Sequence, residues 1–196
     1  METEIFAVKS IGPGELFIMP CPIAALLPDT LQTLQQQGIT KLVSLLEHDE
    51  AEKLGMADEA AACAQAGLDF EQFPIPDHQI PADNQAFQLL SSQLYQELQD
   101  GAKLAIHCYA GIGRAGLLAG SLLIRDGMNA GAAAELLSDR RGFMVPQTRQ
   151  QYLYLLDLEQ AERGENSKAS KDSRATSTHS LPERLRNWFI RRLSPA

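Results

Sequence analysis

The sequence predicts an α/β domain in which helices flank a central, largely parallel sheet. Short apolar, β-rich runs alternate along the chain with longer segments whose apolar residues recur at helical spacing. Parallel strands need such crossover connections, and helices usually supply them. The 196 residues, 44% of them apolar and 21% charged, suffice for one domain with a substantial core plus a tail.

The first half of the chain opens with an expected hairpin. Residues 5–11 and 16–19 are β-rich, and Gly12-Pro13-Gly14 between them has the composition of a turn. A helix is expected after Asp29 and ends at Gly38, where a C-terminal cap glycine belongs. Strands over 41–46 and 69–75 then enclose an alanine-rich helix over 58–66.

The second half alternates in the same way. Asp83 can cap a helix that ends at Asp100-Gly101, and residues 104–107 form a short central strand. An apolar helix to Ile124 follows, and two more helices are expected over 130–138 and 147–162. The capped helix has an apolar face made of Phe87, Leu90, Leu94 and Leu98.

Charge divides the chain into a domain over 1–162, a flexible linker over 163–180 and a basic amphipathic helix over 181–196. Residues 1–162 hold 9 basic and 22 acidic groups, net -13, and residues 163–196 hold 8 basic and 3 acidic groups, net +5. Ser180 and Glu183 have capping-box spacing, and the apolar face beyond them comprises Leu181, Leu185, Trp188, Phe189 and Leu193. Two interpretations of this helix stay open. It binds an anionic membrane or the groove of a partner protein, or it folds back onto the acidic core.

Composition excludes several classes of protein. A net charge of -8 speaks against a surface built for nucleic acid, so no nucleic-acid partner is expected. The three cysteines, an odd number without metal-ligand spacing, indicate neither a disulfide framework nor a zinc site. The first residues lack the pattern of a secretory signal and no run is long enough to cross a bilayer, so we expect a soluble cytoplasmic protein.

The segment 107–114, His-Cys-Tyr-Ala-Gly-Ile-Gly-Arg, carries the chemistry. It lies between a strand and a helix, where several backbone N–H groups and the helix dipole converge on one point and form a cradle for a dianion. Gly111 and Gly113 allow a ligand to approach the backbone closely. Here Cys108 is expected to be a thiolate nucleophile for phosphorus, and Arg114 to grip two phosphate oxygens. An inert buried thiol and a surface arginine are the less favoured alternatives.

This segment resembles the signature loop of the protein tyrosine phosphatase superfamily. The surrounding sequence is similar to its compact dual-specificity branch, in particular the kinase-associated phosphatase (cyclin-dependent kinase inhibitor 3) group, over about residues 15–160. Besides the loop, the similarity is carried by Ile39-Thr40-Lys41, Pro76-Asp77, Asp139-Arg140-Arg141-Gly142 and Gln147-Thr148-x-x-Gln151-Tyr152. The resemblance implies the fold of the cysteine phosphatases.

The resemblance also implies roles for individual residues. Asp77 becomes the general acid, with Asp83 as a competitor that better suits a helix cap. Gln147 and Gln151 orient the attacking water, unless they are merely polar residues of a first helical turn. His107 supports the thiolate, although a structural role is as well supported. The phosphate-binding backbone comprises Tyr109, Ala110, Gly111, Ile112 and Gly113. Arg140 and Arg141 are expected at a solvated helix end, with a share in substrate or loop contacts as the alternative.

The resulting prediction is a cysteine-dependent protein phosphatase that uses no metal or other cofactor. It hydrolyses phosphotyrosine in protein substrates, with phosphoserine and phosphothreonine as further candidates, through a phosphocysteine intermediate. Relatives that take inositol lipids carry lysines where Tyr109, Ala110 and Ile112 stand here, so a phosphoinositide substrate is disfavoured. Ala115 replaces the usual Ser or Thr and predicts slow turnover of the phosphoenzyme. The alternative is a phosphoprotein-binding or scaffolding protein with a slow or vestigial site.

Overall fold

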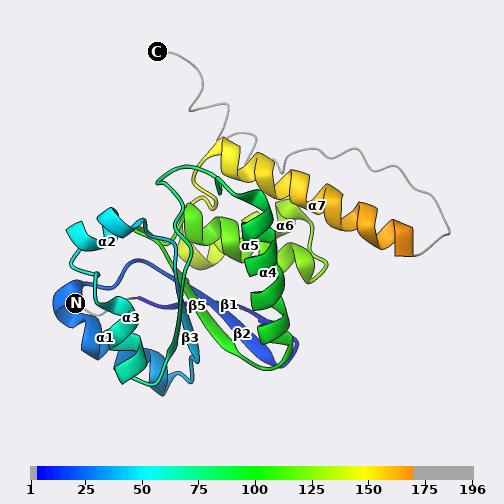
Figure 1. The fold of residues 1–196 in the computed structure, drawn as a ribbon. Coiled ribbons are helices and arrows are strands. Elements are labelled where there is room, and N and C mark those ends of the chain that lie inside the picture. The colour runs from blue at the N-terminus through cyan, green and yellow to red at the C-terminus, as the bar shows by residue number, and fades with distance from the viewer. Residues whose placement is uncertain (1–3, 170–196) are drawn as a thin grey trace, which may run out of the picture.

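The computed structural model describes residues 4–169, which form one α/β unit (Figure 1). The strands are β1 (Phe6–Ile11), β2 (Gly14–Met19), β3 (Lys41–Ser44), β4 (Asp69–Gln72) and β5 (Lys103–His107). The α-helices are α1 (Leu27–Gln36), α2 (His48–Lys53), α3 (Glu59–Gln65), α4 (Asn84–Gln99), α5 (Arg114–Arg125), α6 (Ala130–Arg141) and α7 (Arg149–Ala169), and a 3-10 turn over Ala24–Leu26 precedes α1.

The five strands form one sheet in the order β1-β2-β5-β3-β4. Only the β1–β2 hairpin is antiparallel, and the other three pairings are parallel. The prediction of a largely parallel sheet flanked by helices is therefore confirmed. Figure 1 shows the helices in two groups, α1 to α3 beside one face and α4 to α7 beside the other. Each group closes its own apolar core against the sheet.

The register of the parallel strands determines where a site can form. Met19 and Ser44 both pair with His107, so β2, β3 and β5 end at the same level. The loops that follow these strands therefore meet at one edge of the sheet. Binding and catalytic groups of open parallel sheets gather at this edge, outside the carboxyl ends of the strands.

Several element boundaries differ from those predicted. The first helix begins at Leu27 with Pro28 in its first turn, so Asp29 lies inside the helix and does not precede it. The strands β3 and β4 end at Ser44 and Gln72, earlier than expected. Asp83 does cap α4, since its side chain accepts a hydrogen bond from the N–H of Ala86.

Three helices carry larger differences. The helix α2, six residues long and almost wholly polar, was not predicted. The helix α6 continues to Arg141, beyond the predicted end at 138, and stops at the left-handed Gly142. The last described helix, α7, begins at Arg149 and runs to Ala169. Residues 163–169, which were predicted to belong to a linker, are therefore helical.

The remaining predictions for the tail, a linker to 180 and an amphipathic helix over 181–196, lie outside the described residues. Among residues 4–169, no helix is long and apolar enough to span a bilayer.

Candidate active site

The signature loop runs from Cys108 to Gly113, between the end of β5 and the start of α5. Cys108 is 2% exposed and Arg114 is 1% exposed. Gly111 has a φ of +66°, and a Cβ there would lie 2.3 Å from the carbonyl oxygen of Met19, so only glycine fits. The N–H of Cys21 donates to the carbonyl of Tyr109 at 3.0 Å. The loop is thus held against the segment that follows β2.

Arg141 fastens the same loop from the other side. Its Nε donates to the carbonyl of Gly111 at 3.0 Å, and its Nη2 donates to that of Ala110 at 2.8 Å. The guanidinium also lies 4.0 Å from the ring centroid of Phe6. Arg141 is only 8% exposed, so the expectation of a solvated helix end was wrong for this residue, although its neighbour Arg140 is exposed. Helix periodicity alone could not show that a loop 30 residues away requires two donors.

Arg114 is bound by a carboxylate that sequence reasoning missed. Its Nη1 and Nη2 donate to the two oxygens of Glu50 at 2.6 and 2.8 Å, a bidentate pair. Nη1 also donates to the carbonyl of Ile75 at 3.0 Å. Nε is buried and has no hydrogen-bond partner among the described residues. The fork of Arg114 is therefore oriented by Glu50 while one donor stays available.

The charges of this pair reinforce one another. The hydrogen bond with Arg114 is the largest influence on Glu50 and lowers the pKa of its carboxyl group. Burial works against the charge of Arg114, but the hydrogen bond with Glu50 and the charges of Cys108, Glu50 and Asp77 raise its pKa. Both groups are thus held ionised at neutral pH.

Glu50 reaches Arg114 because of α2. Glu47 and Glu50 form a capping box, in which the side chain of each residue accepts from the backbone N–H of the other. The spacing of Glu47 and Glu50 was a detectable signal for this short helix. The partner of Glu50, Arg114, lies 64 residues further along the chain, and no local sequence pattern indicates this pairing.

Asp77 lies at the same site. Its Oδ1 is 3.0 Å from Nη2 of Arg114, while its side chain remains 51% exposed. His78 follows with a φ of +62°, and its Nε2 lies 3.3 Å from Asp77 Oδ2. The competing carboxylate, Asp83, caps α4 instead. Residues 73–81, the acid loop, lie between β4 and α4 and bring Asp77 to Arg114.

The two predicted glutamines meet the loop at Gly113. A Cβ on Gly113 would lie 3.1 Å from Oε1 of Gln147 and 3.3 Å from Oε1 of Gln151, so both side chains pack against this glycine. Gln151 also donates from Nε2 to the carbonyl of Gln79 at 3.0 Å. Gln147 precedes α7 and Gln151 lies within its first turn. Gln151 thus links the signature loop to the acid loop.

His107 points away from the substrate side, toward α3. Its Nε2 lies 3.1 Å from Oε1 of Glu59, and both side chains are buried, but the two atoms lack the alignment of a hydrogen bond. Its Nδ1 lies 3.4 Å from the carbonyl oxygen of Cys108. Glu59, 3% exposed, is a second buried carboxylate that the sequence did not single out. The predicted support of the thiolate by His107 stays a prediction.

The other two cysteines differ from Cys108 in their surroundings. Burial raises the pKa of both Cys21 and Cys63 to about 12. Cys63 lies in the core between α1, α3 and the sheet. Both thiols are therefore protonated at neutral pH, as expected of packed residues.

Within residues 4–169, no group of three or more His, Cys, Asp or Glu side chains is placed to hold a metal ion.

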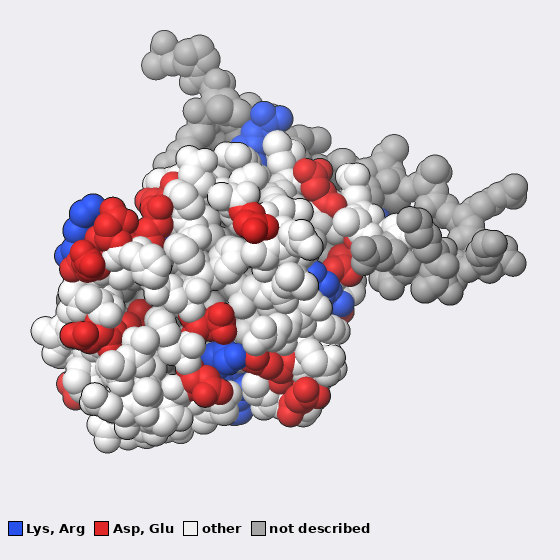
Figure 2. Space-filling model, in the orientation of Figure 1, with Lys and Arg blue, Asp and Glu red and all other residues white. Residues whose placement is uncertain are grey.

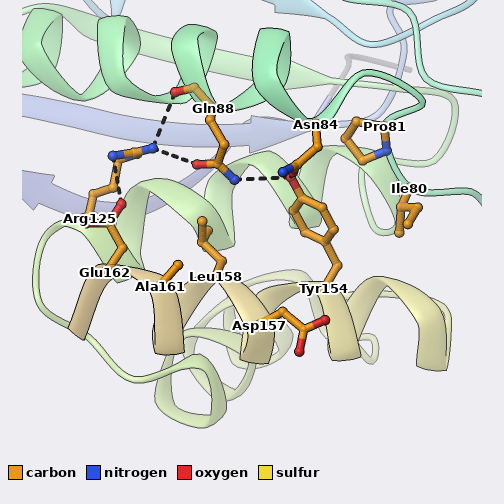
Figure 3. Close-up of a pocket in the computed structure, with 10 residues that line it drawn as sticks. All are labelled: Ile80, Pro81, Asn84, Gln88, Arg125, Tyr154, Asp157, Leu158, Ala161 and Glu162. Atoms are coloured by element: carbon orange, nitrogen blue, oxygen red, sulfur yellow. Dashed lines mark hydrogen bonds and ion pairs between the residues drawn. The ribbon is translucent and has the colours of Figure 1, made fainter. Parts of the chain in front are cut away.

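A cavity of about 460 Å³ lies beside the acid loop and away from Cys108 (Figure 3). Ile80 and Pro81 of that loop form one wall, and side chains of α4, α5 and α7 form the others. Arg125 spans the cavity, since it donates to Gln88 and pairs with Glu162 at 2.7 Å. The acid loop is therefore backed by a solvent-accessible space.

Comparison with known proteins agrees with this geometry. The family model described as "Polymorphic toxin system, DSP-PTPase phosphatase" matches residues 19–128, more than half of the chain. Cyclin-dependent kinase inhibitor 3 of Rattus norvegicus is 30% identical over 126 residues, which cover 63% of this chain and 59% of that protein. The chain thus matches less than two thirds of the length of that relative.

Two further proteins extend the comparison. Protein tyrosine phosphatase PRL-1 of Leishmania major is 25% identical over 144 residues, covering 69% of this chain and 78% of that protein. A crystal structure of kinase associated phosphatase, with its catalytic-site cysteine replaced by serine, superposes with a TM-score of 0.74 at 23% identity, over 83% of this chain and 97% of that one. The match of the family model, together with this shared fold, shows that the chain belongs to the dual-specificity (DSP) phosphatases of the protein tyrosine phosphatase superfamily.

Proposed function

We propose that this protein is a cysteine-dependent phosphatase that hydrolyses phosphate monoesters on proteins. The observation that carries the proposal is that one strand-loop-helix unit holds both Cys108 and Arg114, and that Asp77, from a separate segment, lies 3.0 Å from Arg114. A nucleophile, an anion-binding guanidinium and an acid are what a two-step phosphoryl transfer needs. Membership of a phosphatase family supports the same conclusion.

In the first step the Cys108 thiolate attacks phosphorus in line with the ester oxygen. An S–P bond forms, the P–O bond to the substrate breaks, and Asp77 transfers its proton to the departing oxygen. Backbone N–H groups of the loop, the amino end of α5 and the free Nε of Arg114 stabilise the phosphoryl oxygens.

In the second step water attacks the phosphocysteine. Asp77, now a carboxylate, takes a proton from that water, the S–P bond breaks, and inorganic phosphate leaves with Cys108 again a thiolate. Gln147 and Gln151 are the side chains available to orient the water, because their oxygens lie against Gly113 of the loop. No metal or other cofactor has a role in this scheme.

The decisive experiment compares wild type with Cys108→Ser on an aryl phosphate. The loss of the thiolate lowers kcat/KM by at least about 10³-fold. Quenched samples of wild type contain phosphorus bound to Cys108, as measured by mass spectrometry, and samples of the variant do not. Equal rates for the two proteins would exclude the proposed reaction.

Phosphotyrosine in protein segments is the proposed substrate, with phosphoserine and phosphothreonine next. Related structures include TpbA of P. aeruginosa in complex with phosphotyrosine, at 20% identity and a TM-score of 0.56. The cradle of this chain has only uncharged side chains at Tyr109, Ala110 and Ile112, which favours one phosphate over several. Parallel assays with phosphotyrosine, phosphothreonine and inositol phosphates rank these classes, and preference for the last would overturn the assignment.

The segment 181–196, outside the described residues, is proposed to contact an anionic membrane or a partner protein. Its net positive charge and apolar spacing support this. Co-sedimentation with liposomes rich in phosphatidylserine, comparing the full chain with one that ends at Gly164, tests the membrane contact. Equal binding by the two chains would exclude a membrane role for the segment.

A further inference from the structure

Two acidic side chains are buried among the residues that the structure describes, Glu59 and Glu159, at 3% and 2% exposure. The other acidic side chains in that part of the chain are at least partly exposed, and Figure 2 shows many of them on one face. Glu159 has a structural role, because it accepts a hydrogen bond from the N–H of Ala130 at the start of α6 and pairs with Arg163. Glu59 instead lies beside His107, at the end of β5.

A buried carboxylate needs a partner of opposite charge, and His107 is the partner that the fold brings to Glu59. Nε2 of His107 lies 3.1 Å from Oε1 of Glu59, and the imidazole is fully buried. In the part of the chain that the structure describes, no Lys or Arg pairs with Glu59, and the nearby Arg114 is bound by Glu50. An unpaired charge at this depth would be strongly destabilising.

The other titratable groups around Glu59 are thiols. Burial is the largest influence on Cys21 and on Cys63 and raises the pKa of both to about 12, and the charge of Glu59 adds to this rise. The charge of Cys108 acts on Cys21 in the same direction, so Cys108 belongs to the same electrostatic neighbourhood. Neutral thiols cannot balance a carboxylate, which leaves this role to His107.

The orientation of the imidazole agrees with a positive charge. Nδ1 of His107 lies 3.4 Å from the carbonyl oxygen of Cys108, and Nε2 faces the carboxylate of Glu59. A neutral imidazole has one N–H and one lone pair, so beside a carboxylate it would direct the lone pair at one of these oxygens. An imidazolium has an N–H on both nitrogens and suits both oxygens.

The strand places this pair directly behind the nucleophile. Successive residues of β5 face opposite sides of the sheet: Ala105 lies in the core beside α1 and α3, whereas Ile106 and Cys108 belong to the core on the other face. His107 therefore points to the α3 side while its neighbour Cys108 begins the signature loop. A cation held in the buried interior at this point stabilises a thiolate.

We propose that Glu59 is a positioning residue for the nucleophile: its carboxylate holds His107 as an imidazolium, and this cation stabilises the Cys108 thiolate. The inference rests on the proposed function, in which Cys108 attacks phosphorus, and it adds the group that keeps His107 charged. Without the carboxylate, burial favours the neutral imidazole, and the thiolate loses a neighbouring cation.

Alkylation by iodoacetamide measures the thiolate without any phosphate ester, because the thiolate is the reacting form. Glu59→Gln is expected to lower the rate at Cys108 about tenfold at about pH 6, the effect of one buried charge on a neighbouring ionisation. The two rates converge toward about pH 9, where the thiol ionises in both proteins. Mass spectrometry of the peptides distinguishes Cys108 from Cys21 and Cys63.

Glu159→Gln is the matched control, since it makes the same substitution at the other buried glutamate. Glu159 contacts the first residue of α6, whereas the contact of α6 with the signature loop is made by its last residue, Arg141. This variant is expected to lower the urea midpoint but to leave the alkylation rate of Cys108 unchanged. A general loss of packing would affect both variants alike.

Two further measurements test the role of His107 itself. In the background of His107→Asn, Glu59→Gln is expected to lower the alkylation rate by less than about twofold, because the carboxylate then has no imidazole to act on. Nitrogen NMR spectra of the wild-type side chain show two protonated ring nitrogens at neutral pH, and those of Glu59→Gln show one. The wild-type spectrum keeps the test valid should the variants fold poorly.

Three results would each overturn the proposal: equal alkylation rates for wild type and Glu59→Gln, equal losses in Glu59→Gln and Glu159→Gln, or a single protonated ring nitrogen in wild-type His107. On an aryl phosphate at about pH 6, kcat/KM of Glu59→Gln falls in parallel with the alkylation rate. Failure of the proposed function is distinguishable, since wild type and Cys108→Ser would then hydrolyse the ester equally while the alkylation and NMR results stand.

Discussion

The signature loop and the acid loop meet at Arg114, but they are held in different ways. The signature loop is fastened on two sides, by Arg141 to its carbonyls and by Cys21 to Tyr109. It contains no large exposed side chain other than Tyr109, and its Cys108 is buried. The proposed nucleophile is therefore preorganised by contacts that involve the backbone of the loop itself.

The acid loop is held differently, mostly by side chains of other segments, and Arg114 contacts both Ile75 and Asp77. Gln151 donates to the carbonyl of Gln79 at 3.0 Å, and Thr148 reaches that of His78 at 3.5 Å. Behind Ile80 and Pro81 lies the cavity between α4 and α7, which packed side chains do not fill (Figure 3). Asp77 itself is half exposed.

The two loops therefore suit different roles at this site. A nucleophile that must be ionised and aligned is best held rigidly, whereas an acid that must let substrate enter is suited to a segment that is held by side chains. Four substitutions test these roles, in order of expected effect.

Asp77→Asn is expected to have the largest effect, because the leaving oxygen then departs without a proton. For phenyl phosphate, kcat/KM falls by about 10² to 10³-fold, and the basic limb of its pH profile disappears. The loss is smaller for p-nitrophenyl phosphate, whose leaving group needs less assistance. Equal losses for both esters would show that Asp77 has a structural role only.

Arg141→Lys tests the fastening of the signature loop. Lysine keeps the charge but cannot donate to both carbonyls in the fixed geometry of a guanidinium. We expect kcat/KM to fall about tenfold and the free energy of unfolding, measured by urea denaturation, to fall by about 2 kcal/mol. The exposed neighbour provides the control: Arg140→Lys changes stability by less than about 0.5 kcal/mol. Similar effects of the two substitutions would contradict the anchoring role.

Glu50→Gln alters the pH dependence of stability. Since the pKa of Glu50 is lower in the folded state than its ordinary value of 4.5, its contribution is complete above that pH and is lost as pH falls through the folded pKa. The variant should therefore be less stable than wild type by about 1 kcal/mol at pH 7, and this difference should shrink toward pH 3. Urea midpoints at both pH values measure it, with the exposed Glu52→Gln as control. A constant difference would exclude the ionised Glu50–Arg114 pair as its cause.

Ala115→Ser is expected to have the smallest effect, a few-fold gain in kcat. A hydroxyl at this buried position, directly after Arg114, can donate to the departing sulfur of Cys108 in the second step. Pre-steady-state kinetics on an aryl phosphate should show a burst in wild type that diminishes in the variant. No gain in turnover would contradict slow hydrolysis of the phosphocysteine.

Local sequence predicted the parts of the site that lie within single segments. Cys108 and Arg114 belong to one strand-loop-helix unit, and Asp77 lies in a proline-rich turn between predicted elements. The alternation of strands and helices also predicted a parallel sheet, which places the loops after β2, β3 and β5 at one edge. These features depend on residues close together in the chain, where spacing and composition are informative.

Tertiary structure alone decided which side chains support those groups. Glu50 gave no sign of its partner, and Arg141 was expected first at a solvated helix end, with loop contact as the alternative. Their roles follow from the packing of α2 and α6 against the edge of the sheet, because a buried donor or carboxylate takes the partner that the fold brings to it. The residues proposed as nucleophile, anion-binding guanidinium and acid could thus be predicted from the sequence, whereas the network that holds them required the fold.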